Sequence, residues 1–204
     1  MLQTQTIQPK LLELLTKIMA SEVFKNFFLV GGTSLALQIG HRFSIDIDMF
    51  GNSEIDEFEF TEELSAFGKV TIIKKSKSII IYSVNGIKVD FVNYKYPLLE
   101  KPIVIENIRM VSDKDIAAMK LNAIAGRGSR KDFIDLFFIL KKYSLETLII
   151  FYNNKYKDGS EFMVLKSLTY FDDAENEEMP VMFQEIVWEE VKITILKAIQ
   201  ELTL

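Results

Sequence analysis

Two aspartates, Asp46 and Asp48, alternate with two isoleucines, Ile45 and Ile47, in the middle of the first half of the chain. This alternation predicts a strand over residues 44–50 in which the two aspartates share one face and the two isoleucines share the other. Carboxylates that share a face are close enough to hold one or two divalent cations between their oxygens. The chain has no cysteine and one histidine, so carboxylates must supply the ligands, and we expect Mg²⁺ or Mn²⁺.

A third carboxylate, Asp90, lies in an apolar segment that follows the dipeptide Asn85-Gly86. That dipeptide is typical of a two-residue type I′ turn and predicts a hairpin whose second strand carries Asp90. We expect this strand to lie beside the first two aspartates, so that Asp90 completes a catalytic, metal-binding acidic centre. Asp90 would then bind a second metal or accept a proton, and the sequence leaves both roles open. A salt bridge to Lys88 on the same face is the alternative.

The segment Gly31-Gly32-Thr33-Ser34 follows a short apolar strand predicted over residues 27–30. Glycines allow a backbone to approach a ligand closely, and the free N–H groups at the start of a helix favour a phosphate. We therefore expect these four residues to bind the phosphates of a nucleotide. The alternative is a tight strand-to-helix turn with the two hydroxyl side chains as helix caps.

The remaining pattern predicts an α+β protein with two parts. Residues 1–111 combine short strands and helices, which predicts a small mixed β-sheet flanked by helices. From Ser112, which with Asp115 forms a plausible capping box, helical periodicity continues to a last helix at about residues 184–202. We expect residues 112–204 to form a helical region that packs on the sheet and completes the nucleotide and acceptor cleft.

Composition narrows the class of protein. The chain has 204 residues, of which 49% are hydrophobic, and this is enough to bury a sizeable core. The first eight residues lack the features of a signal peptide, and the apolar runs fall short of the roughly 18 residues that a membrane span needs. We expect a cytoplasmic protein without a membrane partner. The net charge of −5 disfavours broad contact with nucleic acid but permits a local basic patch, for which the dense cluster is Lys69, Lys74, Lys75 and Lys77.

Three segments occur in an order that is similar to a known family. They are GGTSLALQIGHRFSIDIDMF, KVDFV and AMKLNAIAGRGSRKDFIDLFFIL, which together span roughly residues 25–142. They resemble the AbiEii/AbiGii-type nucleotidyltransferase toxins of the DNA polymerase beta-like nucleotidyltransferase superfamily. The resemblance implies the nucleotidyltransferase fold, an NTP donor, magnesium, and an RNA acceptor such as the end of a tRNA.

The resemblance also implies roles for three residues outside the acidic centre. The lysine that matches Lys120 is attributed to NTP binding, the aspartate that matches Asp132 belongs to the active centre, and Arg42 lies in a motif that positions the nucleotide. Lys120 also stands between Ile116 and Ile124 on one helical face, so its stem can pack while its ammonium reaches a triphosphate. Either Asp90 or Asp132 would act as the base.

Roles in structure or at the solvated surface are the alternative for several charged residues of this region. Asp132 and Asp135 could be solvated or paired with Arg130 or Lys131. Arg127 and Arg130 fit phosphate or RNA contact and fit a charged helix-helix turn equally well. The single histidine, which follows a glycine that ends a helix, is expected to be structural.

The function expected from the sequence is metal-dependent transfer of a nucleoside monophosphate from an NTP to tRNA or another RNA. The protein would act as the toxin of a toxin–antitoxin pair or of a phage-defence system, with a cognate antitoxin protein as a partner. The alternatives are transfer to a small hydroxyl compound or to a protein side chain, and a nucleotide-binding module that does not catalyse.

Overall fold

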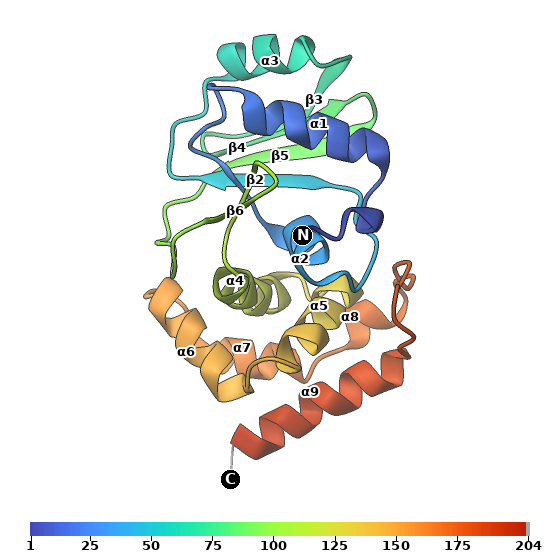
Figure 1. Cartoon of the computed structure of the whole chain (residues 1–204). Coiled ribbons are helices and arrows are strands. Elements are labelled where there is room, and N and C mark those ends of the chain that lie inside the picture. The colour runs from blue at the N-terminus through green and yellow to red at the C-terminus, as the bar shows by residue number, and fades with distance from the viewer. Residues whose placement is uncertain (203–204) are drawn as a thin grey trace. The chain divides into compact units, whose positions relative to one another are not determined.

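The computed structural model of the chain describes residues 1–202 (Figure 1). Two compact units make up the chain. The sheet unit comprises residues 1–97 and 101–111, and the helical unit comprises residues 98–100 and the chain from Ser112 onward.

One mixed sheet of seven strands forms the centre of the sheet unit in the described chain, in the order β3-β4-β5-β2-β1-β7-β6. The pairs β2 with β5 and β1 with β7 are parallel, and the other neighbours are antiparallel. The strands are β1 (Phe28–Leu29), β2 (Ile47–Gly51), β3 (Val70–Lys75), β4 (Ile79–Val84), β5 (Ile87–Asn93), β6 (Ile103–Ile105) and β7 (Ile108–Met110).

A short 3₁₀ helix (Thr4–Thr6) and three α-helices complete the sheet unit: α1 (Pro9–Ala20), α2 (Gly31–Ile39) and α3 (Glu57–Ser65). Figure 1 shows α1 and α3 on one side of the sheet and α2 on the other. Pro9 begins α1, where its missing N–H costs no helical hydrogen bond. Gly40 ends α2 in the left-handed conformation, with φ of 71°, as the sequence predicts.

The core of the sheet unit fixes which face of β2 and β5 carries polar side chains. Ile47, Met49, Val89 and Phe91 are completely buried in one apolar cluster. The residues that alternate with them on the two strands, including the aspartates, therefore face the other way. Phe91 stacks on Phe24, which contributes to this packing.

The predicted hairpin between β4 and β5 is confirmed. Asn85 and Gly86 have φ of 51° and 85°, as a type I′ turn requires at both positions. The Asn85 side chain also accepts a hydrogen bond of 2.8 Å from the backbone N–H of Lys69. The turn sets the register of β5, and with it the place of Asp90.

The boundaries of several elements differ from those predicted. Strand β2 begins at Ile47 and not at residue 44, because Ser44 forms an isolated parallel bridge with Ile7 instead of joining the sheet. Ile45 is consequently 61% exposed and does not share the buried face of Ile47. Strand β1 covers residues 28–29 of the predicted 27–30, and helix α2 already begins at Gly31.

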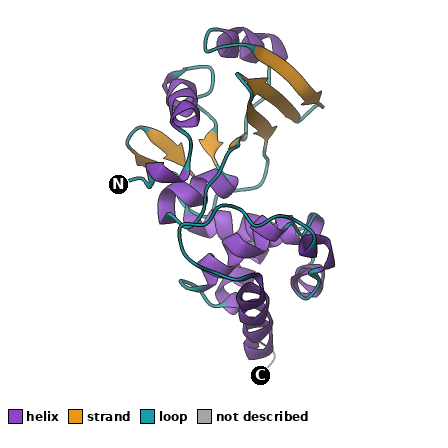
Figure 2. Cartoon of the chain, turned by 90° about the vertical axis from the view of Figure 1, so that its right-hand side faces the viewer, coloured by secondary structure: helices purple, strands orange, loops and turns teal. Residues whose placement is uncertain are grey.

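The helical unit contains six helices in its described part, all shown in purple in Figure 2. They are α4 (Asp113–Gly126), α5 (Arg130–Leu140), α6 (Leu145–Lys155), α7 (Glu161–Leu168), α8 (Asp172–Glu175) and α9 (Trp188–Leu202). The last helix begins at Trp188, later than predicted. Within residues 1–202, no helix is both long and apolar enough to cross a membrane.

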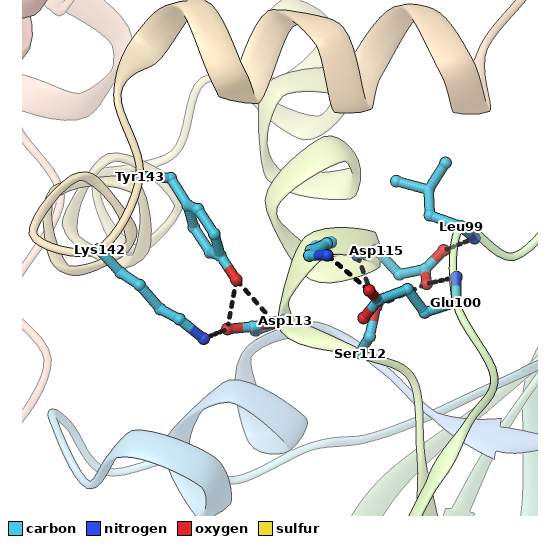
Figure 3. Close-up of polar contacts among 8 residues, drawn as sticks. Leu99, Glu100, Ser112, Asp113, Asp115, Lys142 and Tyr143 are labelled. Carbon is cyan, nitrogen blue, oxygen red and sulfur yellow. Dashed lines mark hydrogen bonds and ion pairs between the residues drawn. The ribbon is translucent and has the colours of Figure 1, made fainter.

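A buried carboxylate, Asp115, ties the short segment 98–100 to the helical unit (Figure 3). Its oxygens accept hydrogen bonds from the backbone N–H groups of Leu99 at 2.9 Å and Glu100 at 3.3 Å. They also accept from the Ser112 hydroxyl at 2.8 Å and from the Lys155 ammonium at 2.7 Å. The Ser112 hydroxyl in turn accepts from the Asp115 N–H, which confirms the predicted helix cap.

Candidate active site

Asp46, Asp48 and Asp90, here called the acidic centre, lie on or next to the paired strands β2 and β5. Asp48 and Asp90 are direct partners in that register. Residues opposite one another on adjacent strands are about 5 Å apart and project from the same face of the sheet. Asp46 precedes Asp48 by two residues, just before β2 begins. The structure therefore brings Asp48 and Asp90 together as the sequence suggests.

Only one of the two carboxylate oxygens of Asp90 has a hydrogen-bond partner among the described residues. Its side chain is 15% exposed, and its Oδ2 accepts a hydrogen bond of 2.6 Å from the Lys88 ammonium. Its Oδ1 is buried and has no hydrogen-bond partner among the described residues. A buried carboxylate oxygen without a donor is costly, so this atom fits a ligand that supplies positive charge.

Nearby carboxylates favour the charged form of Lys88. Burial by itself lowers the pKa of Lys88, but its hydrogen bond to Asp90 and the charges of Asp90, Asp48 and Asp46 together raise the pKa above its usual value. Across residues 1–202, however, no three acidic or histidine side chains stand as a ready metal cage. Carboxylate oxygens are suitable ligands for Mg²⁺, and metal binding by this centre stays a prediction.

The glycine turn lies directly against the acidic centre. Gly31 has φ of 69°, and a Cβ on this residue would stand 2.6 Å from Oδ2 of Asp48. A Cβ on the next glycine, Gly32, would stand 2.1 Å from a guanidinium nitrogen of Arg42. The positive φ of Gly31 favours glycine at that position, and the first turn of α2 and the Asp48 carboxylate are neighbours.

The two hydroxyls of the turn serve internal contacts. Thr33 and Ser34 are buried, as is Arg42. The Thr33 hydroxyl donates a short hydrogen bond to the backbone carbonyl of Asp46 and lies 2.7 Å from the Ser44 hydroxyl. The Ser34 hydroxyl accepts from the Gln38 amide at 3.1 Å. Thr33 thereby positions the segment that carries Asp46, a role without any signal in the sequence.

In the helical unit, five polar residues form what we call the α4–α5 charge network: Lys120, Arg127, Ser129, Asp132 and Asp135. The Lys120 ammonium lies 2.9 Å from Asp132 and 2.6 Å from Asp135, and all three side chains are almost completely buried. Arg127 donates two hydrogen bonds to Asp132, at 2.8 Å and 3.1 Å, and the Ser129 hydroxyl donates a third at 2.7 Å. This network pairs every charge that it buries.

Asp132 is held as a carboxylate by these partners. Burial alone raises its pKa, but Lys120, Arg127 and Ser129 outweigh burial and bring the pKa well below its usual value. An ionised carboxylate that accepts from three side chains is a poor proton acceptor, so this geometry favours a positioning role for Asp132. Neither Arg130 nor Lys131, the partners considered from sequence, makes these contacts.

Arg130 instead anchors other parts of the helical unit. Its guanidinium donates to the backbone carbonyls of Ala174 at 2.9 Å and Glu175 at 2.5 Å, and it lies 4.8 Å from the ring centre of Trp188. Its backbone N–H donates to the Glu177 carboxylate. This favours the structural interpretation of Arg130. His41, too, is completely buried.

Residues 13–197 match the sequence model of a family described as the nucleotidyl transferase AbiEii toxin of type IV toxin–antitoxin systems. This chain belongs to the AbiEii family. The expectation drawn from its three segments is thereby confirmed, and the protein is a nucleotidyltransferase, an enzyme that transfers a nucleoside monophosphate.

One curated relative and two solved structures are similar to this chain over most of its length. An uncharacterized protein of Aquifex aeolicus is 38% identical over 197 residues, which cover 93% of this chain and 94% of that protein. The nucleotidyltransferase toxin MenT4 of Mycobacterium tuberculosis superposes with a TM-score of 0.64 at 14% identity, over 95% of this chain and 82% of that one. JHP933 from Helicobacter pylori gives a TM-score of 0.59 at 22% identity, over 94% and 88%. The two solved structures confirm the predicted fold class.

The family match covers both regions in which candidate residues were predicted. It includes the acidic centre and the glycine turn of the sheet unit and the α4–α5 charge network of the helical unit. Sequence reasoning named the charged members of each group, but it missed Ser129 and the salt bridges from Lys120 to Asp132 and Asp135. Their spacing of 12 and 15 residues crosses a helix-helix turn, so periodicity within one helix could not reveal them.

Proposed function

We propose that this AbiEii-family nucleotidyltransferase moves a nucleoside monophosphate from an NTP to tRNA or another RNA, using Mg²⁺ or Mn²⁺ held by Asp46, Asp48 and Asp90. In this proposal the enzyme works in the cytoplasm as the toxin of a toxin–antitoxin pair or of a phage-defence system, and a cognate antitoxin protein restrains it. The transfer forms a bond between an acceptor hydroxyl and the α-phosphorus and breaks the bond to pyrophosphate.

The observation that carries the proposal is the environment of Asp90. This residue faces Asp48 across two parallel strands, and its buried Oδ1 has no hydrogen-bond partner among the described residues. When bound, a divalent cation would neutralise triphosphate charge and make the acceptor hydroxyl more acidic. The carboxylates would hold the cation, and Asp90 would either bind a second cation or accept the proton of the acceptor hydroxyl.

The glycine turn supplies the phosphate contacts. Gly31 and Gly32 bring backbone to the edge of the acidic centre, and the N–H groups and dipole of the first turn of α2 favour negative charge. The hydroxyls of Thr33 and Ser34 support the turn from the inside. Arg42 packs against Gly32 and adds positive charge to this end of the helix.

Lys120 binds the triphosphate, and Asp132 positions Lys120. The ion pairs with Asp132 and Asp135 fix the ammonium and keep it charged although its side chain is only 6% exposed. A fixed, desolvated cation is suited to stabilising the charge that develops on a leaving pyrophosphate.

An RNA acceptor is supported by the description of the family as a toxin and by local positive charge. The net charge is −5, yet four lysines are exposed on or beside β3 and the turn that follows it, at Lys69, Lys74, Lys75 and Lys77. Lys75 pairs with Glu57. The other members of this group are suited to contact with a phosphate backbone.

The test is to incubate the purified protein with Mg²⁺ and each α-labelled NTP in turn, in separate reactions with total tRNA, protein lysate and small hydroxyl compounds. Label is expected on tRNA with one or a few NTPs, and Asp48→Asn should abolish it while the exposed matched variant Glu178→Gln does not. Label that appears only on protein or on a small compound would overturn the RNA acceptor and leave nucleotidyl transfer intact.

The toxin role has a separate test. Induced expression of the wild-type chain in a bacterial host should arrest growth, and expression of Asp48→Asn to the same level should not. Normal growth with active enzyme present in the cell would contradict the toxin role.

A further inference from the structure

Lys88 lies on strand β5 next to the acidic centre. It precedes Asp90 by two residues on β5, so the two side chains share a face. Asp90 is the direct partner of Asp48 in the parallel pairing of β2 with β5. The ammonium therefore lies on the sheet face that carries these two carboxylates.

Lys88 and Asp90 form a close ion pair. Lys88 donates a 2.6 Å hydrogen bond to Oδ2 of Asp90. The side chain of Lys88 remains 40% exposed, so its long stem has room to move away from the sheet.

An ammonium bound to Oδ2 of Asp90 competes with any cation that needs this carboxylate. A divalent ion at the acidic centre would lie within a few ångströms of the ammonium, and like charges at that distance repel strongly in a partly buried site. Without such an ion, removing Lys88 would leave the largely buried carboxylate of Asp90 without its ammonium partner. The same residue therefore stabilises one state and opposes the other.

We propose that Lys88 is the internal counter-ion of the acidic centre, which holds Asp90 in the metal-free enzyme and is displaced from it when a divalent cation binds. This inference rests on the proposed function in assigning a cation to Asp46, Asp48 and Asp90. It assigns Lys88 a positioning role. Lys88 sets the cation affinity of the site and keeps the ligands in place before the cation arrives.

The test compares Mn²⁺ binding by the full-length wild type, Lys88→Met and Lys88→Arg at one fixed pH. The electron paramagnetic resonance signal of free Mn²⁺ gives the dissociation constant without any need for activity. Lys88→Met keeps the apolar stem and removes the charge, so it should bind Mn²⁺ about tenfold more tightly or better. Lys88→Arg keeps the charge and should stay within about threefold of the wild type.

A second measurement follows thermal unfolding of the same proteins. In EDTA, Lys88→Met should have a lower Tm than the wild type, and saturating Mn²⁺ should raise its Tm by more than it raises that of the wild type. Lys74→Met, which removes an exposed lysine from β3, is the matched control and should change neither quantity. If Lys88→Met does not fold, Lys88→Gln carries the same test.

Unchanged or weaker Mn²⁺ binding by Lys88→Met, with clear binding by the wild type, would overturn the role of Lys88 and leave the proposed function standing. Absence of Mn²⁺ binding by the wild type would instead overturn the metal assignment on which both depend. An unchanged Tm in EDTA would also contradict the counter-ion role.

Discussion

The acidic centre of the sheet unit and the α4–α5 charge network of the helical unit both concentrate carboxylates, but they treat them in opposite ways. In the network, two carboxylates are matched by two cations, Lys120 and Arg127, with a further hydrogen bond from a serine. In the acidic centre, Lys88 pairs with one oxygen of Asp90, and the other oxygen is buried and has no hydrogen-bond partner among the described residues.

This difference separates residues that position from residues that bind. A balanced, buried network contributes a fixed geometry, and breaking it exposes unpaired charge to a low dielectric. A centre that contains a buried carboxylate oxygen without a hydrogen-bond partner is stabilised when a cation binds, so it is suited to a ligand. We expect substitutions in the acidic centre to damage activity more than stability, and substitutions in the network to damage stability first.

The largest effect is expected for Asp48→Asn. Nucleotidyl transfer should fall by about 10³-fold, because the variant loses a charge that holds the cation and cannot regain it from a neighbour. Its Tm should stay equal to or above that of the wild type, since one of three like charges is removed. Labelled nucleotide transfer and a thermal melt check the two parts, and activity within tenfold of wild type would break the comparison.

Asp132→Asn should behave in the opposite sense. Removing the charge leaves Lys120 and Arg127 without their shared carboxylate, which should lower the free energy of unfolding by about 3–5 kcal/mol. Urea unfolding measures this loss. The exposed variant Glu178→Gln makes the same chemical change and should stay within about 0.5 kcal/mol of wild type. A fully stable Asp132→Asn variant would show that the network does not stabilise the helical unit.

The difference in unfolding free energy between the wild type and Asp132→Asn should depend on pH, and this dependence tests whether Asp132 is the group responsible. The pKa of Asp132 in the folded protein lies below its usual value of 3.8. The stability that its charge provides is therefore fully present above the unfolded-state pKa and is lost as the pH falls toward the folded-state pKa. The difference in unfolding free energy between wild type and Asp132→Asn should stay constant from pH 8 to pH 5 and narrow below about pH 4. A gap that changes between pH 6 and pH 8 would point to another titrating group.

A smaller effect is expected for Gly31→Ala, with Gly86→Ala as its matched control. Both glycines have positive φ, so each substitution should cost about 1 kcal/mol of stability. A Cβ at Gly31 would stand 2.6 Å from Asp48, whereas a Cβ at Gly86 would meet nothing within 4 Å. Only Gly31→Ala should therefore lower nucleotidyl transfer, by about tenfold or more. Equal activities in the two variants would contradict the close contact with Asp48.

Local patterns in the sequence were enough to predict the elements of the acidic centre. The Asn85-Gly86 turn requires positive φ at both positions, and the structure has it. Alternation predicts correctly that Asp48 and Ile47 face opposite sides of β2. The fold class and the family are also accessible, because three motifs in a fixed order constrain both.

Long-range packing is what local patterns could not predict. Ser44 bonds to the N-terminal segment through Thr6 and Ile7, which shortens β2 and exposes Ile45. Lys120 was assigned to a nucleotide alone, whereas the packing of α4 on α5 also gives it two carboxylate partners. Such pairs join residues whose distance along the chain has no period, so only the folded structure identifies them.

The proposed cation site at the acidic centre is tested by measuring Mn²⁺ binding by the wild type, Asp90→Asn and Asp132→Asn, because this compares the two charged regions in one measurement. We expect Asp90→Asn to weaken Mn²⁺ binding by at least about tenfold. The substitution removes the charge of the carboxylate whose buried Oδ1 has no hydrogen-bond partner among the described residues. Asp132→Asn should bind as the wild type does wherever it is folded. Binding that is lost in Asp132→Asn and kept in Asp90→Asn would contradict the account and move the cation site to the α4–α5 charge network.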